Sequence, residues 1–139
     1  MASWTTPITN WNSSNYYNFG DLDRVEENTE YLKDEWENIG YSIGTTTFKY
    51  PRTNSTIDFY DDLNRVENNI LALGTGSFIP SPWITPVTDW VTGNSFDFND
   101  ANRLEKNLNS LYDSLNNVKD SLMPTGHPLL ICGKGNTRF

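Results

Sequence analysis

Three stretches of the chain repeat their core-facing positions at steps of three and four, the spacing of one face of an amphipathic helix. The first stretch is Leu22, Val25, Thr29, Leu32, Trp36 and Ile39. The second is Leu63, Val66, Ile70 and Leu73, and the third is Ala101, Leu104, Leu108, Leu111, Leu115, Val118 and Leu122. The pattern predicts three helices. Glycines at 40 and 74 mark the ends of the first two, and Pro124 follows the third.

The third stretch keeps its 3-4 spacing over three heptads, which is typical of a coiled-coil seam. Two destinations fit such a seam. It can close a three-helix core within the chain, because short repeat helices cannot bury themselves alone. It can also pair with copies of itself in an oligomer, through an interface made by Leu104, Leu108, Leu111, Leu115, Val118 and Leu122.

Each predicted helix begins within a string that occurs three times. The copies are Tyr17-Asn-Phe-Gly-Asp-Leu-Asp-Arg-Val-Glu-Glu-Asn28, Ile57-Asp-Phe-Tyr-Asp-Asp-Leu-Asn-Arg-Val-Glu-Asn-Asn69 and Phe96-Asp-Phe-Asn-Asp-Ala-Asn-Arg-Leu-Glu-Lys-Asn107. A period of about 40 residues indicates a repeated supersecondary unit. We therefore divide the chain into unit 1 (1–40), unit 2 (41–80), unit 3 with the long helix (81–123) and an extended tail (124–139).

An extended stretch precedes each string and ends in an aromatic residue. These stretches are 6–11, 45–50 and 85–90, rich in Thr with Pro in the first and third. Pro and β-branched residues favour extended backbone over helix. In the tail, Leu129–Cys132 is short, apolar and suited to a strand. The predicted fold class is therefore helix-rich α+β, with three strand–turn–helix repeats and a short C-terminal strand.

The start of each helix has a capping pattern. The predicted N-caps are Asn18, Asp58 and Asp97, and an acid follows three residues later in each copy: Asp21, Asp61 and Asp100. The arginines Arg24, Arg65 and Arg103 are predicted to fix the corner between extended stretch and helix, by bonding loop carbonyls or the capping carboxylate. Copy two has one extra residue, so Asp62 has the spacing to Arg65 that Asp21 has to Arg24. A ligand-binding or catalytic role for the arginines is the weaker alternative.

Four tryptophans lie on the extended stretches of copies one and three: Trp4, Trp11, Trp83 and Trp90. They can cover the small core of their own unit, anchor an interface with other subunits, or stack on sugar rings.

Charge and composition exclude several classes of function. The net charge of −8, with scattered basic residues, argues against nucleic acid and anionic membranes as partners. No stretch is long and apolar enough for membrane insertion, and no secretion signal is recognisable. The single histidine, His127, and single cysteine, Cys132, give neither metal-ligand spacing nor a supported nucleophile–base pair. We expect no cofactor, no metal site and no enzymatic activity.

Two strings carry a resemblance to a known group of proteins. Trp4-Thr-Thr-Pro-Ile-Thr-Asn-Trp11 and Asp62-Leu-Asn-Arg-Val-Glu-Asn-Asn69 resemble a repeat of small tail, baseplate and tail-fibre proteins of phages and prophages of Gram-positive bacteria. The resemblance covers 4–39, about 43–73 and 83–122, and copy two departs from it at Tyr50. It implies a non-enzymatic structural or adaptor component of the virion tail, synthesised in the host cytoplasm, that self-associates and contacts other tail proteins. The alternative is a module that binds a host cell-wall glycan or receptor.

Overall fold

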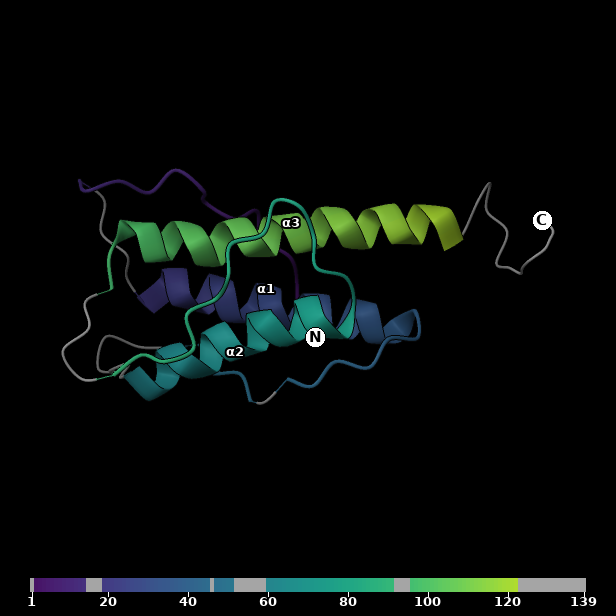
Figure 1. Ribbon diagram of the computed structural model, residues 1–139, viewed down its shortest axis with the longest axis horizontal. Coiled ribbons are helices and arrows are strands. Elements are labelled where there is room, and N and C mark those ends of the chain that lie inside the picture. Colours follow the sequence, from purple (N-terminus) through teal and green to yellow (C-terminus); the bar gives the residue numbers. More distant parts are fainter. Residues whose placement is uncertain (1, 15–18, 46, 52–59, 92–95, 123–139) are drawn as a thin grey trace.

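The computed structural model describes residues 2–14, 19–45, 47–51, 60–91 and 96–122. Within these ranges the regular elements are three helices, α1 (Phe19–Asn38), α2 (Tyr60–Gly76) and α3 (Phe98–Leu122). Each helix packs against the other two, so the fold is an all-α three-helix bundle (Figure 1).

The predicted α+β class is therefore wrong for the part of the chain that the structure describes, because its extended stretches form no strands. A strand needs a neighbouring backbone to complete its hydrogen bonds. Here side-chain amides and carboxylates of the helices bond the extended backbone instead, as detailed below. The predicted strand at Leu129–Cys132 lies outside the described residues.

The three helices run in the same direction, and extended segments return along the outside of the bundle (Figure 1). We name these segments arm 1 (2–11), arm 2 (41–45 and 47–51) and arm 3 (78–90). A parallel bundle made from one chain requires such returns, because each helix ends far from where the next begins. Each copy of the repeat thus contributes one arm and one helix.

The core of the bundle is formed by the predicted helical faces. The side chains of Leu104, Leu108, Leu111 and Leu115 are at most 1% exposed, as are Leu32, Trp36, Ile70 and Leu73. Two roles were predicted for the α3 seam, a core within the chain and an interface between copies. For these four leucines the structure shows the core within the chain. Val118 is partly buried against that core, and the side chain of Leu122 lies outside the description.

The helix ends follow local chemistry. In α3 the Asp97 carboxylate accepts the Asn99 and Asp100 N–H groups at 2.9 and 3.3 Å, and the Asp97 N–H donates to Asp100 Oδ2 at 2.9 Å. This reciprocal pair is a capping box. The other predicted caps, Asn18 and Asp58, lie outside the described residues.

At the end of α1, Gly40 adopts φ 105°, and Tyr41 N donates to Trp36 O at 3.1 Å. With Gly40 N on Glu37 O at 3.0 Å, this is a Schellman motif, and it confirms Gly40 as the residue after the helix. The same prediction for Gly74 is wrong, because α2 continues to Gly76.

Candidate functional site

Each repeated arginine bonds an acid one turn earlier on its own helix. The distances are 3.0 Å for Arg24 Nη1 to Asp21, 2.7 Å for Arg65 Nη1 to Asp62 and 2.7 Å for Arg103 Nη1 to Asp100. The carboxylate that serves Arg65 is Asp62, and the predicted corner residue Asp61 is exposed on the helix surface. The extra residue of copy two therefore displaces Asp61 from the position that Asp21 and Asp100 hold.

Each arginine also bonds a glutamate from a different copy. Arg24 of copy one bonds Glu105 of copy three through both Nε, at 2.9 Å, and Nη2. The remaining two pairs are Arg103 of copy three with Glu67 of copy two, and Arg65 of copy two with Glu26 of copy one. The three pairs close a ring that links copy one to three, three to two, and two to one.

These glutamates are not among the residues predicted from the sequence. Arginine and glutamate two positions apart lie on different faces of one helix, which excludes a pair within a copy. The sequence pattern that could have revealed them is the recurrence of Glu26, Glu67 and Glu105 two residues after each arginine. All three are at most 1% exposed, and a buried carboxylate requires a partner.

Two of these glutamates also hold an arm. Glu105 accepts the Ile8 N–H at 3.3 Å and the Trp11 indole Nε1–H at 3.0 Å. Glu67 accepts the Val87 N–H at 3.1 Å and the Trp90 Nε1–H at 3.0 Å. The two arms therefore lie on the helix of the next copy in the ring.

Arm 2 differs from arms 1 and 3 at the position where its sequence differs from theirs. Tyr50 stands in place of the tryptophan, and its hydroxyl donates to Glu30 at 2.5 Å. Burial, together with the hydrogen bond and charge of Glu30, raises the pKa of Tyr50 well above its usual range.

Asparagine side chains complete the fixation of the arms. Asn28 bonds both backbone groups of Thr5, at 2.9 and 2.7 Å, and Asn107 does the same for Ile84 at 2.9 and 2.7 Å. These two pairs lie within a copy. Asn102 holds both backbone groups of Trp11 at 2.9 Å each, and Asn64 holds those of Trp90 at 2.7 and 3.0 Å. These two pairs join neighbouring copies, and in all four an amide imitates a neighbouring strand.

The four predicted interface tryptophans all contact their own chain. Trp4 stacks on Tyr112 of α3, with ring centroids 4.0 Å apart and planes within 4°. Trp83 packs against the core beside Gly74. Trp90 is 5% exposed, and Trp11 is half-buried through its contacts with α3.

The surroundings of Arg103 favour its charged form. Burial of Arg103 opposes its charge, but hydrogen bonds and the charges of Glu67 and Asp100 outweigh it and raise the Arg103 pKa. At the far end of the bundle, a hydrogen bond from Lys119 to Glu35, 2.7 Å long, raises the pKa of Lys119 despite partial burial. Both arginine and lysine therefore stay cationic near neutral pH.

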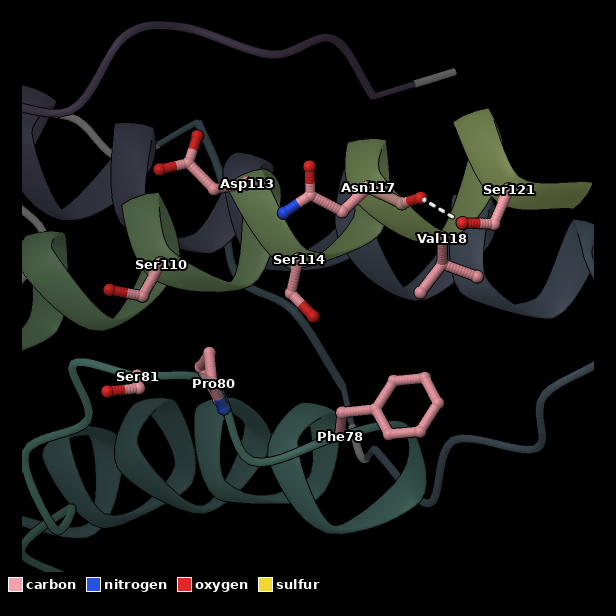
Figure 2. Close-up of a pocket in the computed structure, with 9 residues that line it drawn as sticks. All are labelled: Phe78, Pro80, Ser81, Ser110, Asp113, Ser114, Asn117, Val118 and Ser121. Carbon is pink, nitrogen blue, oxygen red and sulfur yellow. Dashed lines mark hydrogen bonds between the residues drawn. The ribbon is translucent and has the colours of Figure 1, made fainter. Parts of the chain in front are cut away.

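One open groove of about 490 Å³ lies between α3 and the start of arm 3. Figure 2 shows Phe78 opposite Val118 at one end and Pro80 facing the serines of α3. Its lining supplies hydroxyls, an amide and the Asp113 carboxylate. Among the described residues that line it, none is a histidine or lysine that could activate a serine hydroxyl.

In the described ranges, no three His, Cys, Asp or Glu residues are placed to hold a metal ion. None of the described helices is long and apolar enough to span a membrane. No protein-family model, curated protein or solved structure matches the chain.

Proposed function

We propose that the chain is a non-enzymatic structural or adaptor component of a phage-type tail. The observation that carries the proposal is the ring of Arg24–Glu105, Arg103–Glu67 and Arg65–Glu26 pairs. The most distinctive residues of the repeat bond other copies of the repeat, which is a building role rather than a catalytic one. The resemblance of the repeat to those of tail and baseplate proteins supplies the setting.

A ring of buried ion pairs suits a scaffold that must keep its shape. Guanidinium–carboxylate pairs have fixed fork geometry, so they define how the three copies are oriented. The outer surface then remains for partners. Three apolar side chains are exposed near the start of arm 3: Phe78 at 48%, Ile79 at 54% and Ile84 at 42%. Exposed apolar side chains this close in sequence support contact with another tail subunit.

The alternative of a glycan-binding module has less support. Sugar rings stack on exposed aromatic faces, but Trp90 is buried and Trp4 is covered by Tyr112. The Trp11 indole N–H is engaged by Glu105. The tryptophans that suggested sugar binding are thus used to hold the arms.

Immunogold electron microscopy tests the proposal. An antibody against this chain is applied to phage particles produced with the coding sequence intact and to particles produced after its deletion. We expect gold on the tail of the first particles, and defective or shortened tails in the second. Unlabelled particles, together with normal tails and infectivity after deletion, would contradict a structural role in the virion.

A further inference from the structure

Arm 1 lies in a groove whose contacts are independent of the arm's connection to α1. One wall of this groove is α1, with Asn28 on Thr5. The other wall is α3, with Tyr112 stacked on Trp4 and Asn102 on the Trp11 backbone. We refer to it as the α1/α3 groove. All of these groups belong to helices. The groove can therefore bind an arm whether or not that arm is covalently joined to α1 of the same chain.

The contacts depend on a short pattern rather than on a unique sequence. Arm 3 repeats the hydrogen bonds with the same spacing: Ile84, Val87 and Trp90 correspond to Thr5, Ile8 and Trp11. Trp83 holds the position of Trp4 in the pattern but lies beside Gly74. The side chains of Thr5 and Ile84 differ, yet both are held through their backbone N–H and C=O groups. The two arms share the pattern Trp-x-Thr-Pro-Ile/Val-Thr-x-Trp, and the helices hold both arms at its positions.

We propose that the α1/α3 groove accepts arm 1 of a second copy of this chain, so that copies associate by exchanging arms. Every contact of the exchanged arm has its counterpart in the intramolecular one. An exchanged arm therefore needs no new contact surface. The free-energy cost of exchange is that the arm is no longer linked covalently to the helices that it binds. The proposal concerns only copies of this chain, and its failure would leave the proposed tail role unaffected.

A peptide experiment tests the groove directly. The full chain carrying Trp4→Ala and Trp11→Ala has a weakened arm, and it is titrated with a fluorescently labelled peptide of residues 2–14. We expect saturable binding that raises fluorescence anisotropy. A control peptide with alanine in place of both tryptophans should bind at least about tenfold more weakly, because the stacking and indole hydrogen bond are lost. Equal binding of both peptides, or no binding, would overturn the proposal.

A second measurement uses the unmodified chain in case the double variant does not fold. Two batches carrying donor and acceptor dyes are mixed, unfolded in urea and refolded together over a range of concentrations. Arm exchange predicts a dimer by light scattering and energy transfer that both increase with concentration. Adding an excess of the 2–14 peptide during refolding should suppress the dimer, and the control peptide should not. Monomer alone at every concentration, or a dimer that the 2–14 peptide leaves unchanged, would overturn the proposal.

Discussion

Each buried glutamate of the repeat is neutralised by an arginine that belongs to a different copy. Removing one partner of a buried pair leaves an uncompensated charge, which costs far more than an exposed pair contributes. No copy can therefore bury its own glutamate alone. At the level of single residues, each copy of the repeat therefore depends on its neighbours in the bundle.

The pair of Arg103 and Glu67 gives the sharpest prediction at this scale. Replacing Glu67 by Gln preserves its shape but removes the fully buried counter-charge of Arg103, which then keeps only its partly exposed pair with Asp100. We expect a loss of about 3 kcal/mol or more in the free energy of unfolding, measured by urea denaturation.

Glu37→Gln is the matched control, because Glu37 is exposed and pairs with Lys33 only one turn away on the surface of α1. Its effect should stay within about 0.5 kcal/mol. A Glu67→Gln chain as stable as this control would show that the pair contributes little.

Tyr50 predicts a change in stability at alkaline pH. Its pKa in the folded chain is raised above the ordinary 10.0 by burial and by Glu30. Folding therefore favours the protonated phenol. The resulting stability is fully present below about pH 10 and is lost as the pH rises beyond it.

Urea denaturation at about pH 9 and about pH 11 measures this effect. The unmodified chain should lose more stability between the two than the Tyr50→Phe variant, which lacks the titrating group. Equal losses in the two chains would refute the assignment.

At the residue scale, hydrogen bonds within one helical turn could be predicted from the sequence, whereas hydrogen bonds between helices could not. The spacings of Asp97 to Asp100 and of Asp21 to Arg24 determine contacts within one helical turn, so the sequence contains them. The bond from Arg24 to Glu105 depends on which helix lies beside which and in what direction. That information is absent from local spacing.

At the scale of elements, the end of α2 approaches arm 2 very closely. A Cβ placed on Gly76 would lie 2.9 Å from the Ser42 carbonyl oxygen and 2.9 Å from Ile43 Cδ1. Since a backbone atom cannot move aside like a flexible side chain, Gly76→Ala should destabilise the chain by about 1–3 kcal/mol.

Gly44→Ala is the comparison on the same arm, because nothing lies within 4 Å of a Cβ at that position. We expect its melting temperature to stay close to that of the unmodified chain and that of Gly76→Ala to fall clearly. Equal melting temperatures would mean that arm 2 does not pack against α2 as described.

The elements also show why helices could be predicted and the arms could not. Helix periodicity arises from burial of one face, and the buried positions Val25, Leu32, Val66 and Leu104 display it directly. Extended residues predict a strand only when a backbone neighbour exists. In arms 1 and 3 that neighbour is replaced by Asn28, Asn102 and their counterparts, which no strand pattern reveals.

For the whole molecule, three parallel helices and their returning arms interlock in one ring. Each of arms 1 and 3 begins on the helix of its own copy and ends on the next one. The units that the sequence marks as repeats are therefore not independent bodies. The groove lined by Phe78 and Val118 lies between α3 and the start of arm 3 (Figure 2).

The enclosed tryptophans predict how the molecule responds to sugars. Wall polysaccharide should leave the tryptophan fluorescence unchanged over a wide range of concentration, because Trp36 and Trp90 are buried and Trp4 is stacked. Saturable quenching that disappears in Trp11→Ala would instead favour the glycan-binding alternative.

The central claim is that the repeats neutralise each other in ring order, and a double-mutant cycle tests it most directly. Urea unfolding is measured for Arg103→Met, Glu67→Gln, Glu105→Gln and the two double variants that contain Arg103→Met. Ring order predicts a coupling energy of about 2 kcal/mol between Arg103 and Glu67, and close to zero between Arg103 and Glu105 of its own copy. A coupling with Glu105 as large as that with Glu67, or no coupling with Glu67, would contradict the ring.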